Sequence, residues 1–219
     1  MPAESITDKK KRAVIIIRLL QKHYPRARCT LNFDTVHQLL VATILSAQCT
    51  DERVNKVTPD LFKKYRTVKA FANADLKELE RDIFTTGFYV NKARAIKLSA
   101  AQILNDFHGE IPRTLDGLVR LSGVGRKTGS VILGAGYGIA EGIVVDTHVG
   151  RISRLLGFTR EKDAVKIEKN LIKIIPQNHW IKYSHELIEH GRSICKARKP
   201  ACERCFLSKW CPSAGRNTG

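Results

Sequence analysis

Apolar side chains recur along most of this chain at the three- and four-residue spacing of buried helix faces. The first run, over residues 14–20, begins with four β-branched residues and so has the composition of a strand. Its length and the two leucines at its end favour a buried helix over residues 13–24 instead. No stretch alternates apolar and polar residues long enough to predict a strand ladder. The pattern therefore predicts an all-α protein.

Capping residues and helix breakers divide the later apolar runs into separate helices. Asp34 and Asp51 can each accept the first amide hydrogen bonds of a helix, and Pro59 is predicted to interrupt the second of these helices. Asn73 or Asp75 begins a short helix. Longer helices are predicted over residues 90–108, 147–156, 163–175 and 183–194.

The stretch over residues 115–148 combines a predicted helical hairpin with candidate chemistry. A helical run breaks at the SGVG of residues 122–125 and then resumes. Two glycines one residue apart permit a tight turn and a close approach of the backbone to another molecule. The turn opens onto a helix N-terminus, which favours a phosphate group. Lys127 lies in the first turn of that helix, and Asp146 follows a short apolar run.

The charge balance indicates a polyanionic partner. The chain has 219 residues, with 38 Lys and Arg against 21 Asp and Glu, which gives a formal net charge of +17. Nucleic acid is the first candidate and an anionic membrane surface the second. No apolar stretch approaches the roughly 20 residues that span a bilayer. The start, KKKRAVIIIRLL, has the basic and apolar parts of a signal peptide, but Arg18 interrupts the apolar part. We therefore expect a cytoplasmic protein, associated with the nucleoid in a prokaryote.

Four of the six cysteines form a cluster near the C-terminal end, spaced C-x6-C-x2-C-x5-C. In an intracellular chain this spacing favours a metal site over two disulfides. Four thiolates can hold a [4Fe–4S] core or a tetrahedral zinc ion. Structural zinc more often uses two paired CxxC arms, so the spacing favours iron–sulfur slightly. The candidate ligands are Cys195, Cys202, Cys205 and Cys211.

Four motifs in the same order and at similar spacing resemble the endonuclease III family. They are LSAQCTD, LSGVGRKTG, VVDTH and HGRSICKARKPACERCFLSKWC, and the resemblance runs from about residue 13 to Cys211. Members of this family are helix-hairpin-helix DNA glycosylases that carry an iron–sulfur cluster. The resemblance implies two helical domains. One is a helical barrel over residues 30–140 with the hairpin, and the other joins residues 1–29 to 141–219 and holds the [4Fe–4S] cluster.

The resemblance also implies a reaction. Lys127 matches the catalytic lysine, whose amine attacks C1′ of the sugar, forms a Schiff base and permits β-elimination on the 3′ side. Attack needs a neutral amine, a form that the positive end of the hairpin's second helix and burial in the cleft would favour and a close Asp146 carboxylate would oppose. Asp146 matches the essential aspartate, which accepts protons or stabilises positive charge, and it is also a good helix cap. The implied enzyme is a bifunctional glycosylase and AP lyase acting on oxidised pyrimidines such as thymine glycol.

The implied substrate is double-stranded DNA with a damaged base or an abasic site, bound by a monomer. The target base must leave the helix, and side chains must fill the gap. Gln48 matches one such wedge. Phe88 is the candidate for the other, where the family often has Leu, although core packing explains it equally well. Cys49 departs from the more usual Ala. The remaining expected DNA contacts are Gly123, Val124, Gly125, Arg126, His148, Lys196, Arg198 and Lys199.

Two alternatives remain open at this stage. The first is a related helix-hairpin-helix glycosylase that excises a mismatched or differently damaged base. Adenine-mismatch and thymine-mismatch glycosylases share the hairpin and the cluster but usually lack a lysine at the position of Lys127. The second is a non-enzymatic DNA-binding module, which would prefer particular undamaged sequences and show no turnover.

Overall fold

The structure is a computed structural model that describes residues 4–215. Within that range the regular structure consists of α-helices with short 3-10 and π-helical segments, and the described part of the chain contains no strand. The prediction of an all-α protein is confirmed. No helix among the described residues is long and apolar enough to cross a bilayer.

The chain forms two compact units. The central unit comprises residues 30–141, and the terminal unit joins residues 1–29 to residues 142–219. Each unit has its own buried core, because the apolar stripe of every helix is covered by other helices of the same unit.

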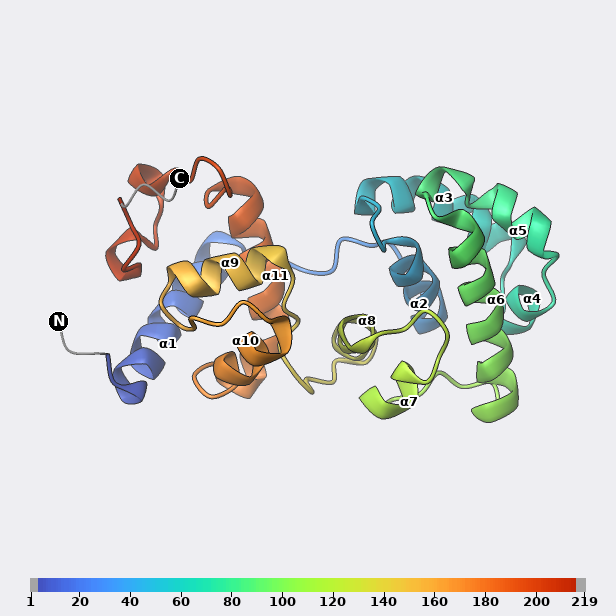
Figure 1. Ribbon diagram of the computed structural model, residues 1–219, viewed down its shortest axis with the longest axis horizontal. Helices are drawn as coiled ribbons and strands as arrows, with labels where there is room; N and C mark the ends of the chain where they lie inside the picture. Colours follow the sequence, from blue (N-terminus) through green and yellow to red (C-terminus); the bar gives the residue numbers. More distant parts are fainter. Residues whose placement is uncertain (1–3, 216–219) are drawn as a thin grey trace. The chain divides into compact units, whose positions relative to one another are not determined.

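The terminal unit is built around the first helix of the chain. Helix α1 packs against α11, which in turn packs against α9, and α10 also contacts α9 (Figure 1). Its core includes Ile16, Leu20, Val149, Leu171 and Tyr183, each less than 2% exposed. The helices are α1 (Ile6–His23), α9 (Thr147–Leu155), α10 (Ala164–Leu171) and α11 (Trp180–Ser193), with short 3-10 turns η3 (Gln177–His179), η4 (Cys202–Arg204) and η5 (Ser208–Trp210).

The central unit is organised around α6, the long green helix in Figure 1. Helices α2, α4 and α5 pack against it. Its buried stripe contains Ala93, Ile96, Ala100 and Ile103. The elements of this unit are α2 (Val36–Leu45), α3 (Asp51–Lys64), α4 (Val68–Ala72), α5 (Leu76–Asp82), η1 (Phe84–Thr86), α6 (Tyr89–Asp106), α7 (Leu115–Val119), α8 (Arg126–Val131) and the π-helical η2 (Ile132–Tyr137).

Two predicted helix caps are wrong by one residue. Helix α2 is capped by Thr35, whose hydroxyl accepts the Gln38 amide at 3.2 Å, whereas the amide of Asp34 donates to the Gln38 side chain. Helix α3 is capped by Thr50 instead of Asp51. In both cases the threonine has the extended backbone that a cap needs, so its hydroxyl meets the third amide of the helix.

Helix α3 is not interrupted at Pro59, contrary to the prediction. It continues from Asp51 to Lys64 with Pro59 inside it. Proline in a helix interior removes one hydrogen bond and costs about 3 kcal/mol. Burial of Val54, Thr58 and Leu61 on one face of the same helix offsets that cost. The short helix α4 was not predicted, because its five residues are too few to show a periodic pattern.

Candidate functional site

The two glycines of the hairpin have different structural roles. Gly123 has a φ of +77°, and a Cβ atom there would lie 2.8 Å from the Cβ of Ala95 on α6. This position therefore needs glycine for both its backbone conformation and its packing. Gly125 has an extended backbone, and a Cβ atom there would meet nothing within 4 Å. Its open face is the part of the turn that another molecule can approach.

The first turn of α8 exposes backbone amides. No side chain caps this helix, and its first main-chain hydrogen bond runs from the Gly129 amide to the Gly125 carbonyl at 2.9 Å. Main-chain hydrogen bonding within the helix therefore begins at the Gly129 amide. Lys127 lies in this turn and its side chain is exposed.

Helix α6 supports the hairpin from within the central unit. The side-chain oxygen of Gln102 accepts the Ser122 amide at 2.8 Å, and its nitrogen donates to the Arg120 carbonyl at 3.1 Å. One amide side chain thus satisfies a donor and an acceptor of the turn. Sequence reasoning assigned no role to Gln102, because its partners lie 18 and 20 residues away.

Both wedge candidates have a left-handed backbone. The φ angles of Gln48 and Phe88 are +53° and +50°, and only His108 shares this property among the non-glycine residues of the described chain. Gln48 lies beyond the end of α2 and is exposed. Phe88 is 61% exposed, so packing in the core is excluded for it. A left-handed backbone in a residue with a side chain is uncommon, and such strain is typical of functional positions.

The Asp146 carboxylate begins helix α9 of the terminal unit. Its Oδ1 accepts the Val149 amide at 2.7 Å, and the residue is half-buried. The capping prediction for Asp146 is confirmed. The hydrogen bond fixes the direction of the carboxylate and supplies a partner for its negative charge.

His148 packs against the neighbouring helix α11. A Cβ atom at Gly191 would collide with the imidazole ring of His148, so the ring fills the space that this glycine leaves. Burial lowers the pKa of His148, and the nearby Asp146 charge opposes that effect. The ring is therefore mainly neutral near pH 7. This packing accounts for His148 without a ligand.

The four cysteines of the C-terminal cluster line one apolar cavity, together with Ile152, Leu155, Leu156, Ile194 and Leu207. All four are half-buried free thiols. Burial and the charges of the other three cysteines raise the pKa of the Cys195 thiol to about 11, although Arg151 acts in the opposite direction. Four thiolates at this position therefore need a cationic group between them.

The cavity fits an iron–sulfur core better than a single zinc ion. Zinc would require four sulfurs at about 2.3 Å from one point. Among residues 4–215, no three His, Cys, Asp or Glu side chains stand close enough to share one ion. A [4Fe–4S] core is larger, because each of its irons takes one thiolate. The arrangement of the donors around a cavity suits this group.

Two arginines of the terminal unit hold the segment over residues 195–211, which we call the cluster loop. Arg12 donates to the Leu156 carbonyl at 2.7 Å and to the Trp210 carbonyl at 3.0 Å. Arg151 donates to the Cys195 carbonyl at 2.6 Å. These bonds attach both ends of the loop to helices, so the loop has a defined position on the terminal unit.

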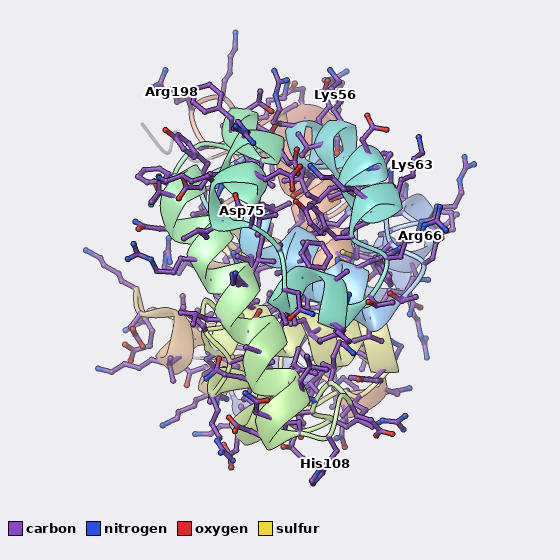
Figure 2. The ribbon with its side chains drawn as sticks, turned by 90° about the vertical axis from the view of Figure 1, so that its right-hand side faces the viewer. Lys56, Lys63, Arg66, Asp75, His108 and Arg198 are labelled. Atoms are coloured by element: carbon purple, nitrogen blue, oxygen red, sulfur yellow. The ribbon has the colours of Figure 1, made fainter. Side chains whose placement is uncertain are left out.

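The loop between the first two ligands carries exposed cations. Lys196, Arg198 and Lys199 are all exposed, and Arg198 extends away from the backbone (Figure 2). No ion pair neutralises these three within residues 4–215. By contrast, Lys56 and Lys63 on α3 are paired with Glu52 and Asp60 at 2.8 and 3.0 Å. The cluster loop is therefore the less compensated cationic surface.

Comparisons with known proteins agree with this geometry. Residues 41–177 match the HhH-GPD superfamily of base excision DNA repair proteins, and residues 195–211 match the iron–sulfur binding domain of endonuclease III. The second match spans the segment with the four clustered cysteines and shows that the cofactor is a [4Fe–4S] cluster. The site assignments for individual DNA contacts stay predictions.

The relatives cover almost the whole chain. Endonuclease III of Synechocystis sp. is 50% identical over 209 residues, which is 95% of each chain. A solved non-covalent endonuclease III–DNA complex is 43% identical, with a TM-score of 0.88, and covers 94% of this chain and 96% of its own. A trapped covalent endonuclease III–DNA intermediate has a TM-score of 0.87 at the same identity and coverage. This chain therefore belongs to the endonuclease III family of base excision DNA repair proteins.

Proposed function

We propose that Lys127 is the nucleophile and Asp146 its acidic partner in this enzyme. The protein is a bifunctional DNA glycosylase and AP lyase that removes oxidised pyrimidines during base excision repair. The observation that carries the assignment to Lys127 is its place in the hairpin. An exposed amine stands in the first turn of an uncapped helix, next to a glycine whose outer face is open.

The proposed reaction proceeds through an imine between Lys127 and the sugar. The neutral amine of Lys127 attacks C1′, and the bond between C1′ and the damaged base breaks, with the electron pair leaving on the base. The bond between C1′ and the ring oxygen then breaks, and the oxygen takes up a proton to become a hydroxyl. An imine forms between Lys127 and C1′. The imine acidifies the C2′ proton, and its removal expels the 3′ phosphate by β-elimination. Water then releases the lysine.

The Asp146 carboxylate suits two tasks in this sequence. It stabilises the positive charge that develops on the sugar as the base leaves, and it accepts a proton from the attacking amine. Its hydrogen bond to the Val149 amide keeps it oriented. Such a preoriented charge needs little reorganisation during the reaction.

The other candidate residues bind DNA in this proposal. The hairpin residues Gly123, Val124, Gly125 and Arg126 contact a phosphate of the DNA backbone. Gln48 and Phe88 fill the gap left by the extruded base. The [4Fe–4S] cluster supplies a rigid core that presents Lys196, Arg198 and Lys199 to the phosphate backbone. We further propose that the enzyme acts as a monomer in the cytoplasm, in association with the nucleoid.

Borohydride trapping tests the nucleophile, because the reagent reduces the imine to a stable amine. We expect the wild-type enzyme to form a covalent adduct with duplexes that contain thymine glycol or an abasic site. Lys127→Gln should form none while still binding the same duplexes. An adduct that persists in Lys127→Gln would show that another amine attacks. Duplexes with an adenine mismatch or no damage, run in parallel, separate this enzyme from a mismatch glycosylase.

A further inference from the structure

A buried lysine on α6 connects the two loops that carry the wedge candidates. Lys92 is only 5% exposed. Its Nζ donates to the Leu45 carbonyl at 2.7 Å and to the Thr86 carbonyl at 2.8 Å. The first acceptor lies 47 residues away in sequence, and the second lies six residues away. One cation therefore joins three segments of the central unit.

The two acceptors lie a short distance before the strained residues in the sequence. Leu45 is the last residue of α2, and Gln48 follows it in the next turn. Thr86 is the last residue of η1, and Phe88 follows after one glycine. Each left-handed backbone is strained and persists only where its surroundings hold it. The ammonium of Lys92 binds the carbonyl just ahead of both strained turns.

Burial of an ammonium group destabilises the fold unless hydrogen bonds replace those that it made to water. Burial lowers the pKa of Lys92, whereas the nearby Cys49 thiol raises it. A shorter or apolar side chain would avoid this cost but would leave both carbonyls without their shared donor. The lysine has the reach and the several donors needed to bind two carbonyls that belong to different loops.

We propose that Lys92 is a positioning residue that holds Gln48 and Phe88 as one preassembled wedge for entry into the duplex. The proposal rests on the wedge roles given above. Because both loops are attached to the same ammonium, the two side chains keep a constant relation to α6. The same helix contacts the hairpin through Ala95 and Gln102. Wedge and hairpin are thus supported by one rigid element within the central unit.

Lys97 is a matched control on the same helix. Its Nζ donates to the Ala74 carbonyl at 2.5 Å. Ala74 lies in the loop before α5, and that loop carries no wedge candidate. Lys97→Met removes a lysine–carbonyl bond of the same kind. Both Met variants retain the length of the aliphatic stem, so packing is disturbed little.

The first experiment measures wedge entry without chemistry. The probe is a thymine glycol duplex with 2-aminopurine beside the lesion, whose fluorescence rises when the neighbouring bases unstack. We expect the rise on binding to be largely lost in Lys92→Met and kept in Lys97→Met. Equal signals for the two variants would overturn the proposal. Lys92→Gln, whose neutral amide reaches at most one carbonyl, gives an intermediate signal and replaces Lys92→Met if that variant does not fold.

The second experiment is a double-mutant cycle on the single-turnover excision rate. Lys92→Met should lower the rate about tenfold or more, because small misplacements of positioning groups are costly. In a variant that already carries Gln48→Ala and Phe88→Ala, Lys92→Met should lower the remaining rate by less than about twofold. A residue that acts only through the wedge has no further effect once the wedge side chains are removed. A purely structural lysine would cause the same loss in both backgrounds, which would refute the positioning role. A wild-type enzyme that forms no trapped adduct would instead refute the proposed function, and the fluorescence result would still decide the role of Lys92.

Discussion

The Asp146 carboxylate accepts a 2.7 Å hydrogen bond from the Val149 amide, so one group both caps helix α9 and stands as the candidate catalytic carboxylate. These two roles use different properties. Capping needs only an acceptor oxygen, whereas stabilising a developing cation needs a negative charge. Substitutions at this position can therefore separate them.

Asp146→Asn should keep the cap and lose the charge. We expect the free energy of unfolding to change by less than about 0.5 kcal/mol, while the single-turnover excision rate falls about 100-fold or more. Asp146→Ala should lose the rate and also about 1 kcal/mol of stability. Denaturant unfolding and excision on a thymine glycol duplex check both statements. Full activity in the Asn variant would remove Asp146 from the chemistry.

The hairpin glycines should respond oppositely to alanine. Gly123→Ala places a Cβ atom against Ala95 on a left-handed backbone, and we expect it to destabilise the fold by about 1–3 kcal/mol. Gly125→Ala has free space and an extended backbone, so its stability should stay within about 0.5 kcal/mol. Its affinity for DNA should fall, because the methyl group keeps the phosphate away from the turn. Unchanged DNA binding in Gly125→Ala would mean that DNA does not approach this glycine.

The cluster loop should contribute sequence-independent affinity for DNA. Reversing Lys196, Arg198 and Lys199 to Glu should weaken binding to all duplexes alike and reduce the slope of log K against log salt by up to about 3, near 0.9 for each lost phosphate contact. The control reverses Lys56, Lys63 and Arg66, which are exposed on and just after α3 (Figure 2). It makes the same change in formal charge. Equal losses in both triple variants would indicate a general effect of charge.

Arg12 should stabilise the iron–sulfur cluster from outside its ligand set. Arg12→Met leaves the part-buried Leu156 and Trp210 carbonyls without their donor, at a cost of up to about 1–3 kcal/mol each. We therefore expect the absorbance of the cluster, near ~400 nm, to decay faster in the presence of an iron chelator. Arg160→Met, at an exposed position, is the control. Equal decay rates in the two variants would show that these hydrogen bonds do not protect the cluster.

Glu186 should make stability depend on pH. It is 1% exposed, neither of its oxygens has a hydrogen-bond partner among the described residues, and burial raises its pKa from 4.5 to about 7. The folded chain therefore keeps this proton at pH values where the unfolded chain has released it. The contribution of Glu186 to the free energy of unfolding should be highest below pH 4.5, fall as the pH rises to about 7, and stay low above that.

Glu186→Gln should remove this dependence. The variant should be more stable than the wild type above pH 7, by on the order of 3 kcal/mol, and nearly equal to it at pH 4.5. Chemical denaturation across that range measures the difference. Parallel curves for the two proteins would show that Glu186 does not titrate between these pH values.

Features that depend on near neighbours could be predicted from the sequence. Helical stripes such as that of α6 repeat every three or four residues, and the caps at Asp75, Asp146 and Asp163 bind amides three residues ahead. The all-α class, the hairpin break and the spacing of the four cysteines follow from such local patterns. Two caps were missed by one residue, because adjacent Asp and Thr are both good caps and only the backbone conformation chooses between them.

Contacts between distant segments were decided by the tertiary structure alone. A lysine within an apolar stripe, such as Lys92 before Ile96, signals a buried charge, but its acceptor 47 residues away has no mark in the sequence, because every residue has a carbonyl. The exposure of Phe88 was undecided for the same kind of reason, since an aromatic ring can pack inside or stand outside. In the structure Phe88 is 61% exposed on a left-handed backbone, and it follows the loop whose Thr86 carbonyl Lys92 binds. Hydrogen bonds and packing across the fold, which no spacing along the chain encodes, therefore set the conformation of the residues proposed to meet DNA.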